Sequence, residues 1–467
     1  MCILVAVVAP AAPGTDIDAW STTAIPQATL KIAGIGFRVS ALSADGRIAV
    51  VADAHGVYLF RTPSEGSWGS IPKPTARLRV PTARLGNLTA VALSQTGTTA
   101  LVAVGAVGNR QAVVFVFHAS SPGAWRSSVR PTALLTDAAE PAGFGSGVAL
   151  SADGSTALVG DPGGADVFHA ATANSWRNTS APTATLVADP TDAEAGALST
   201  AVALSADGTT ALIGTTSDYT FAGAAYIFRA GAAGAWASSA TPDAVLTDGF
   251  VGQPGDEFGA AVALSPDGLT ALVGAPNLAF GPAGAAFLFQ VRTLSAWTTT
   301  ADPEAVLERA AGVVPGWSVA LSGEGTALVG EPSVSGRRGA ARVFHFVGRD
   351  VARNTLANAA SPPRDLFGAA VSLSSDGTTA LISSARASFV FTRAGSRGAS
   401  YCYVPYVRGQ VLRSARRAIE STRCRVGRVS RISASREGSD RVVSQSPKPG
   451  ARLVKHRTVD LRISTGR

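Results

Sequence analysis

An internal repeat with a period of about 55 residues constrains the fold of this chain more than any other feature. The pattern Leu-Ser-x-x-Gly occurs seven times, with its leucines at 42, 93, 150, 204, 264, 321 and 373. A second pattern, Trp-x5-Pro-x-Ala-x-Leu, occurs six times with unchanged spacing, beginning at Trp20, Trp68, Trp125, Trp176, Trp236 and Trp297. Such periods are typical of solenoids and propellers, in which one small unit is stacked many times.

Each period predicts four short strands. In one period they are residues 242–246, 258–265, 270–274 and 285–289. Pro266-Asp267-Gly268 lies between the second and third segments and predicts a tight hairpin, because glycine supplies the positive φ. Seven such periods predict an all-β fold, a seven-bladed β-propeller of four-stranded blades over residues 20–395. Pro362–Leu366 stands in place of the Trp motif in the last period, where we expect the ring to close.

The repeats resemble the FG-GAP family, known from integrin α-subunit propellers and from bacterial surface proteins. The resemblance is carried by Phe258-Gly259 with Val273-Gly274-Ala275-Pro276, by Phe144-Gly145 with Val159-Gly160-Asp161-Pro162, and by Phe367-Gly368. Gly316-Trp317 and Leu198-Ser199 depart from it. Calcium-binding members carry a DxDxDG loop, which here has shrunk to SADG, SPDG or SSDG. Since a hard cation takes six or more oxygen ligands, we expect no metal site in the chain and no cofactor, and the resemblance is to the metal-free bacterial members of the family.

The amino terminus indicates export. Residues 1–19 are interpreted as a truncated signal peptide and leader, because Ile3–Val8 is apolar and Ala9-Pro10-Ala11 offers small residues for cleavage. A positively charged start is missing, and a plain disordered terminus is the alternative. No later run approaches the ~20 apolar residues of a membrane-spanning helix. We therefore expect a secreted or cell-wall-associated bacterial protein without a membrane span.

Residues 401–467, after a linker at 396–400, differ sharply from the rest of the chain. Residues 400–467 hold 16 Lys and Arg against four Asp and Glu, a balance of +12, whereas the remainder holds 24 against 28, a balance of −4. The pattern predicts a small α+β domain of one strand, one amphipathic helix with Val411 and Leu412 on its apolar side, and three further strands.

This tail resembles a PASTA domain, the module of bacterial serine/threonine kinases and penicillin-binding proteins. Val404-Pro405 with Gly409, Arg425-Val426-Gly427 and the turn Gln445–Gly450 carry the resemblance. It implies binding to peptidoglycan fragments without catalysis. Cys402 and Cys424 flank the first strand and the helix, and we expect export to let them form a disulfide.

The titratable residues do not indicate a catalytic site. His118, His169 and His345 follow the repeat phenylalanine at a position that Arg61, Gln290 or Thr392 fill elsewhere, as on an outward strand face. The carboxylates of the Leu-Ser-x-x-Gly turns are explained by turn chemistry; they are Asp45, Asp153, Asp207, Asp267 and Asp376. Asp53, Asp161 and Glu331 align after the third strand of their repeats, and the alternative reading is a shared site at one rim.

We therefore expect an exported binding protein that is not an enzyme. Its tail engages peptidoglycan or another anionic cell-wall polymer, and its propeller is a scaffold for an unidentified protein or glycan. Two alternatives stay open: an adhesin-like interaction protein whose tail is a spacer, and a propeller hydrolase or lyase. Arg-rich surfaces also attract nucleic acid, but export disfavours that partner.

Overall fold

The computed structural model describes most of the repeat region and of the tail. The described residues are 20, 26–32, 34–64, 66–69, 72–81, 88–106, 111–127, 130–137, 143–188, 200–216, 223–249, 257–276, 284–307, 316–347, 350–358, 361–393, 401–404, 407–421, 424–433, 439–447, 452–454 and 458–466. The expected leader at 1–19 and linker at 396–400 lie outside them.

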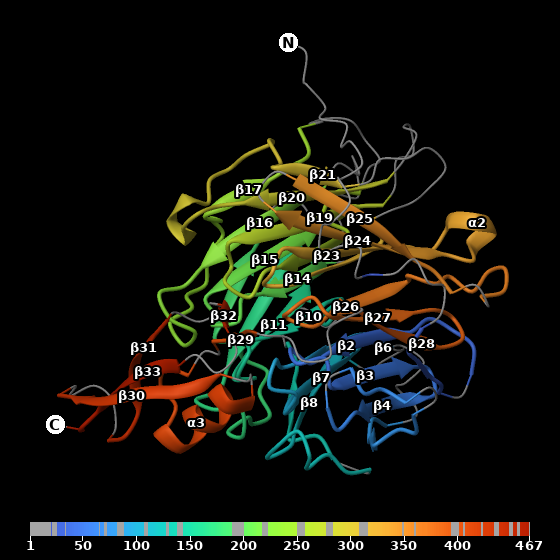
Figure 1. Cartoon of the computed structure of the whole chain (residues 1–467). Helices are drawn as coiled ribbons and strands as arrows, with labels where there is room; N and C mark the ends of the chain where they lie inside the picture. Colours follow the sequence, from blue (N-terminus) through green and yellow to red (C-terminus); the bar gives the residue numbers. More distant parts are fainter. Residues whose placement is uncertain are drawn as a thin grey trace.

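Seven four-stranded antiparallel sheets are formed by the described repeat residues (Figure 1), and we number them in chain order. Sheet 1 contains β2 (Val39–Leu42), β3 (Ile48–Asp53), β4 (Gly56–Arg61) and β5 (Ala76–Leu78); sheet 2 contains β6 (Leu88–Leu93), β7 (Thr99–Val104), β8 (Val113–His118) and β9 (Ala133–Leu135); sheet 3 contains β10 (Val148–Leu150), β11 (Thr156–Asp161), β12 (Gly164–His169) and β13 (Ala184–Val187).

The remaining sheets repeat this order. Sheet 4 contains β14 (Thr200–Leu204), β15 (Thr210–Thr215), β16 (Ala224–Arg229) and β17 (Ala244–Leu246); sheet 5 contains β18 (Ala261–Leu264), β19 (Thr270–Ala275), β20 (Ala285–Gln290) and β21 (Ala305–Leu307); sheet 6 contains β22 (Ser318–Leu321), β23 (Thr326–Glu331), β24 (Ala340–Val347) and β25 (Asp350–Leu356). Sheet 7 contains β26 (Ala370–Leu373), β27 (Thr379–Ser383) and β28 (Ser388–Thr392), joined by β1 (Ala28–Leu30) from the start of the chain. Short helices lie at Leu294–Ala296 (η2) and Val334–Arg337 (α2).

The Trp motif forms the outer strand of the preceding sheet. Strand β17 pairs with β16, with Leu246 opposite Ala225. Residues 242–246 were expected to be the first strand of the same sheet as residues 258–289, and this was wrong. They instead form the fourth strand of the preceding sheet, because the chain reaches each Trp motif only after it has laid down the first three antiparallel strands. The segment that takes the place of the Trp motif in sheet 6 was also misplaced. It is β25, because Leu356 of β25 is opposite Ala341 as Leu307 is opposite Ala286 in sheet 5. Pro362–Leu366 lies after that strand.

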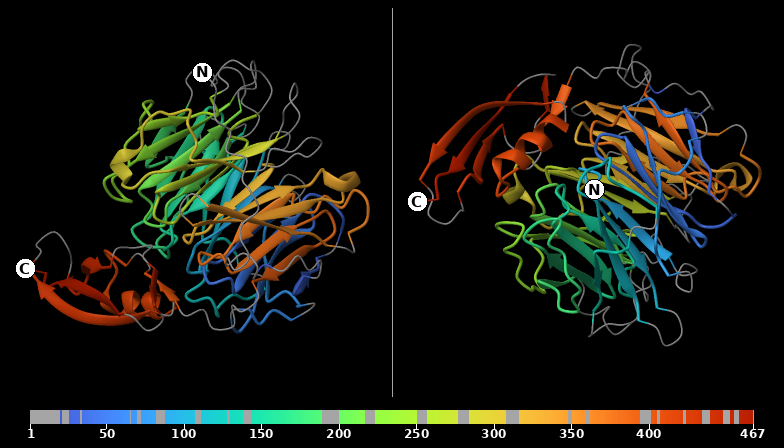
Figure 2. Two further views of the ribbon diagram at one scale, coloured as in Figure 1. Left: turned by 45° about the horizontal axis from the view of Figure 1, so that its top comes forward. Right: turned by 90° about the horizontal axis from the view of Figure 1, so that it is seen from below.

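The first strands of neighbouring sheets contact one another in a closed circuit, from β2 through β6, β10, β14, β18, β22 and β26 back to β2. Sheets 1 and 7, blue and orange, consequently lie side by side (Figures 1 and 2). In sheet 7 the outer position is filled by β1, with Ala28 opposite Val390 and Leu30 opposite Ser388. Because propellers are built from four-stranded sheets arranged radially, the fold is propeller-like, and the small first strands lie at its centre.

The Leu-Ser-x-x-Gly turns are linked from sheet to sheet by backbone hydrogen bonds. The N–H of Ala152 donates to the oxygen of Ala206 at 2.9 Å, and that of Ala206 donates to Pro266 at 2.8 Å. Ser375 of sheet 7 donates to Ala44 of sheet 1 at 2.9 Å, which joins the last sheet to the first. Pro266 stands at the donor position of sheet 5 and has no N–H to give.

Within each turn the serine and the aspartate hold the hairpin. In sheet 3, Ser151 Oγ donates to Asp153 Oδ1 at 2.7 Å and accepts the N–H of Thr156 at 3.0 Å. Asp153 Oδ1 also accepts the N–H of Ser155 at 3.0 Å. Gly154 has a φ of 75°, which favours glycine. These turn carboxylates are therefore committed to backbone bonds, as the sequence predicted for them.

The repeat tryptophans join each turn to the core between sheets. Trp176 is buried among side chains of sheets 2 and 3, which include Val114 and Val159. Its Nε1–H donates to the carbonyl oxygen of Gly154 at 2.9 Å. Equivalent bonds to the turn glycine are made by Trp68, Trp125, Trp236 and Trp297. The repeat tryptophans therefore fill the space between adjacent sheets.

The tail folds around a helix and two small sheets, to one side of the propeller-like sheets (Figure 2). Strand β29 (Tyr401–Tyr403) pairs with β32 (Arg452–Val454). Strands β30 (Arg425–Ile432), β33 (Thr458–Ser464) and β31 (Val442–Ser446) form the second sheet, in that order, with β30 parallel to β33. Helix α3 (Leu412–Ser421) buries Ala415 and Ile419 in the tail core.

Two details of the predicted tail were wrong. Five strands are present among the described tail residues where four were expected, because the short β32 pairs separately with β29. Val411 precedes the helix and is 41% exposed, so it does not belong to the apolar side. None of the described helices is long and apolar enough to cross a membrane.

Replacing Trp176 with phenylalanine tests the role of the indole bond. We expect the variant to unfold at a lower urea concentration, with a loss of about 2 kcal/mol, because the buried Gly154 oxygen loses its donor and a small cavity forms. Trp317→Phe is the control, since Trp317 is 48% exposed and lies outside the motif. Equal stability of the Trp176 variant and the parent would contradict this role.

Candidate functional site

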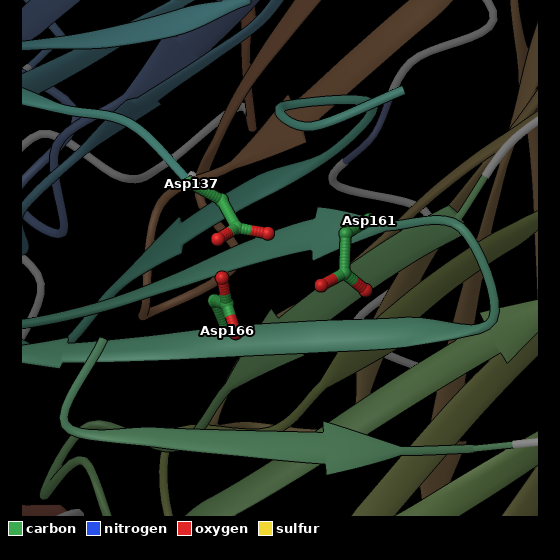
Figure 3. Close-up of side chains that lie close together, drawn as sticks. All are labelled: Asp137, Asp161 and Asp166. Atoms are coloured by element: carbon green, nitrogen blue, oxygen red, sulfur yellow. The ribbon is translucent and has the colours of Figure 1, made fainter. Parts of the chain in front are cut away.

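Three carboxylates lie together between sheets 2 and 3. Oxygens of Asp137, Asp161 and Asp166 lie within 4.8 Å of one another, the only such group of three His, Cys, Asp or Glu residues in the described part of the chain. Asp137 follows β9 of sheet 2, Asp161 ends β11, and Asp166 lies on β12 (Figure 3). The cluster therefore joins the outer strand of one sheet to the inner strands of the next.

Local strand geometry positions the pair from sheet 3. Asp161 is opposite Gly164 in the β11–β12 hairpin, and Asp166 is opposite Val159, two residues further along each strand. Alternation along a strand places Asp161 and Val159 on one face, and Figure 3 shows an oxygen of Asp166 turned toward Asp137. The bend that brings Asp137 to this face follows directly from the end of β9.

Asp166 is the most deeply buried member, at 1% exposure. Its Oδ1 accepts a hydrogen bond from Thr185 Oγ1 on β13 at 2.8 Å, whereas its Oδ2 is buried and has no hydrogen-bond partner. Burial raises the pKa of Asp166 from 3.8 to about 6; the Thr185 bond lowers it, and the Asp137 carboxylate raises it. A buried carboxylate is costly to ionise unless a positive charge lies beside it, and without such a charge it tends to keep its proton.

The register shows how unusual Asp166 is within the repeats. The equivalent residue in every other sheet is an aromatic side chain or an arginine: Tyr58, Phe115, Tyr226, Phe287, Arg342 and Phe389. An acid at one copy of a position otherwise occupied by large side chains marks sheet 3 as different from its neighbours.

The three strand-end acids considered from sequence do not form one group. Asp161 lies with Asp137 and Asp166, whereas Asp53 lies 3.5 Å from the guanidinium of the buried Arg38. Glu331 accepts a hydrogen bond from Arg342 Nε at 2.7 Å. Sequence reasoning aligned Asp161 correctly but missed Asp137 and Asp166, because their contact depends on strand pairing and on the neighbouring sheet. The sequence carried one signal of this site: Asp166 stands at a position where most other repeats have an aromatic residue.

The repeat histidines lie half-buried at strand ends and contact threonine. Nδ1 of His118 lies 3.1 Å from Thr99 Oγ1, and that of His169 lies 2.9 Å from Thr156 Oγ1. His345 makes the same contact with Thr326 at 3.1 Å. Burial lowers the pKa of His118 and His169. These contacts account for the histidines as parts of the strand pairs.

A second surface of interest is the outer face of the tail sheet. Val459, Leu461 and Ile463 of β33 point into the tail core, so the alternate residues of this strand face outward. Exposed arginines occur on two of the strands: Arg425, Arg428 and Arg431 on β30, and Arg462 on β33. Arg462 pairs in register with Ser444 of β31. We call Arg425, Arg428 and Arg462 the basic face.

One acid, Asp460, lies on the same sheet. Asp460 Oδ1 accepts the N–H of Arg428 at 2.7 Å, while Arg431 forms an exposed ion pair with Asp440 at 3.2 Å. Arg425, Arg428 and Arg462 therefore remain the principal cations of the sheet. Arginine is suited to carboxylates and phosphates, which it meets with two parallel hydrogen bonds.

The comparisons with known proteins identify a family for the tail. Residues 403–465 match the PASTA domain family. No curated protein matches the chain.

Several solved structures are similar to the chain in fold alone. A chain of the mitotic checkpoint complex crystal structure is 14% identical with a TM-score of 0.53, covering 83% of this chain and 99% of that one. Hydrazine synthase of Kuenenia stuttgartiensis is 14% identical with a TM-score of 0.50, covering 80% and 97%. The C-terminal WD40 domain of Sif2 is 12% identical with a TM-score of 0.45, covering 79% and 99%.

The raised pKa of Asp166 predicts a particular pH dependence in buffer containing a chelator. The native carboxyl keeps its proton to higher pH than the unfolded chain does, so the free energy of unfolding falls as pH rises from about 4 to about 6. The fall amounts to roughly 2–3 kcal/mol. Asp166→Asn, which cannot ionise, should lose this fall and be more stable than the parent at pH 7.

Urea unfolding at pH 4.5 and pH 7 measures the effect, with Asp302→Asn as the control because Asp302 is exposed. An identical pH dependence in the parent and in Asp166→Asn would show that this carboxyl does not titrate as described.

Proposed function

We propose that this chain is an exported, non-catalytic binding protein whose PASTA domain attaches it to peptidoglycan or an associated anionic polymer, while the propeller presents a scaffold to a protein or glycan partner. The observation that carries the proposal is the match of residues 403–465 to the PASTA family together with the exposed basic face of that domain. Cell-wall polymers bear carboxylates and phosphates, which are the groups arginine recognises.

The propeller belongs, in this proposal, to a seven-bladed FG-GAP-like type. Supporting it, Phe258 and Phe367 pack edge-to-face on Phe289 and Phe391 at centroid distances of 6.2 and 5.9 Å. The glycine after Phe258 has a φ of 93°, and a Cβ there would lie 2.5 Å from the oxygen of Ala224 in the preceding sheet. The motif is thus explained by packing between sheets. Because the single carboxylates of its shortened hairpins already accept backbone N–H groups, the proposal includes no metal ion in those hairpins.

A scaffold role is supported by the use of the titratable groups. The turn aspartates and the repeat histidines are engaged in bonds within or between strands, at positions shared by many sheets. An enzyme concentrates convergent polar groups with perturbed pKa values in one cleft. A hydrolase or lyase is disfavoured because Asp166, whose carboxyl has a raised pKa, is only 1% exposed and does not line a cleft open to substrate. The basic face disfavours a tail that is only a spacer.

Capture by the basic face should depend on its arginines. For the full chain carrying Arg425→Gln, Arg428→Gln and Arg462→Gln, we expect sedimentation with insoluble peptidoglycan to weaken about tenfold at 0.1 M salt, equal to 1.4 kcal/mol. The matched control replaces three exposed propeller arginines, Arg61, Arg177 and Arg292, with glutamine. Binding of the parent should decrease with salt as screening shortens the Debye length from ~10 Å to ~3 Å. Equal binding by both triple variants would contradict the role of this face.

A disulfide between Cys402 and Cys424 belongs to the same proposal. Cys424 is buried in the tail core and is disulfide-bonded, and Cys402 lies on β29 of the same domain. Closing a loop of about 22 residues contributes roughly 3 kcal/mol in the chain-entropy account. We expect no reactive thiol in the native tail and a lower melting temperature for the tail after reduction. Mass spectrometry after alkylation reads this directly, and two alkylated tail cysteines would refute the pairing.

A further inference from the structure

We infer that Asp137, Asp161 and Asp166 bind one hard divalent cation, such as Ca²⁺ or Mg²⁺, at the contact between sheets 2 and 3. The starting observation is the approach of three carboxylates within 4.8 Å at a largely buried place. Three ionised carboxylates at this separation repel one another, and burial weakens the screening that water would provide. A cation placed among their oxygens removes both penalties.

An independent observation points to a ligand. Asp166 is 1% exposed, and its Oδ2 is buried without a hydrogen-bond partner. Buried polar atoms are almost always satisfied, and an exception calls for an ion, water or strain. The other oxygen of Asp166 is already held by Thr185, which fixes the orientation of the carboxylate toward Asp137 (Figure 3).

Two other sheets show that this place in the fold accepts positive charge. In sheet 6, Glu331 ends β23 as Asp161 ends β11, and Arg342 occupies the register position of Asp166. The Nε of Arg342 lies 2.7 Å from Glu331. In sheet 1, the guanidinium of Arg38 lies beside Asp53. Where the chain supplies an arginine, its guanidinium neutralises the acid, whereas sheet 3 has the acid Asp166 at the position of Arg342.

The donor set has the chemistry of a hard cation site. Carboxylate oxygens are the preferred ligands of Ca²⁺ and Mg²⁺, and three carboxylates supply up to six oxygens. The set contains no histidine or cysteine, which softer transition metals favour. The hairpin loops play no part in it, because all three ligands lie at or near strand ends. A bound ion here links two neighbouring sheets, so its binding should stabilise the propeller.

The full chain provides the test. After exhaustive chelation and desalting, melting is followed in EDTA, in 1 mM Ca²⁺ and in 1 mM Mg²⁺, and the bound metal is counted by elemental analysis after equilibration with each ion. We expect one ion per chain and a melting temperature several degrees higher with the preferred ion than in EDTA. The comparison of the two ions identifies which one the site prefers.

Three variants locate the effect. Asp161→Asn with Asp166→Asn should abolish both the bound ion and the response to EDTA. Asp166→Arg should also stop responding to EDTA while staying stable, because it reproduces the arrangement of Glu331 and Arg342. The matched control is Asp248→Asn: Asp248 follows β17 as Asp137 follows β9, but Ala275 and Phe287 hold the positions of Asp161 and Asp166 in the adjoining sheet 5. It should keep the ion.

Either of two results overturns the inference. One is a parent chain that binds neither ion and melts at the same temperature in EDTA and in both salts. The other is a double asparagine variant that keeps the parent's bound ion and EDTA response. Neither result depends on the tail or on peptidoglycan, so this test stands apart from that of the proposed function.

Discussion

The pairing of β1 with β28 is the interaction on which the rest of the propeller depends. Sheets 1 to 5 take their outer strands from the Trp motifs that follow them, and sheet 6 takes β25, so sheet 7 has no such motif downstream. The motif of Trp20, at the start of the chain, supplies its outer strand. The Thr392 hydroxyl donates to Gln27 at 2.7 Å beside this strand, and the buried Arg38 donates to the oxygen of Ser384 across the same seam. This pairing joins residues more than 350 apart in sequence and closes the ring of sheets.

Most of the repeated residues serve that ring. The turn serines and aspartates hold hairpins, the tryptophans join those hairpins to the core, and the glycines of the FG motif allow adjacent sheets to approach closely. Chemistry other than packing is found where one copy departs from the others. Asp166 at an aromatic position and Arg342 at the same position of sheet 6 are such departures. In a repeat protein, a residue that departs from the repeat at a buried position of the strand register is the best indication of a role other than packing.

The sequence predicted the strands and turns well because both depend on local pattern. Alternation, the Leu-Ser-x-x-Gly turn and the apolar segments place strands within a few residues of those observed, as for residues 270–274 against Thr270–Ala275. The phase of the sheets could not be read, since a strand such as Ala244–Leu246 is compatible with either neighbour until its partner is known. The acidic site was missed for the same reason: Asp137 meets Asp161 only through the contact of two sheets, which no spacing in the chain records.

The molecule combines two surfaces of opposite character, a mildly acidic propeller and a basic tail domain. In the proposed function the tail attaches the chain to the cell wall, and the propeller is left for a second partner. The most direct measurement compares sedimentation with insoluble peptidoglycan for the full chain and for a chain ending at residue 395. We expect the full chain to sediment and the shortened chain to stay in solution with an intact thermal transition. If the shortened chain sediments as well as the full chain, the attachment lies in the propeller and the division of roles is wrong.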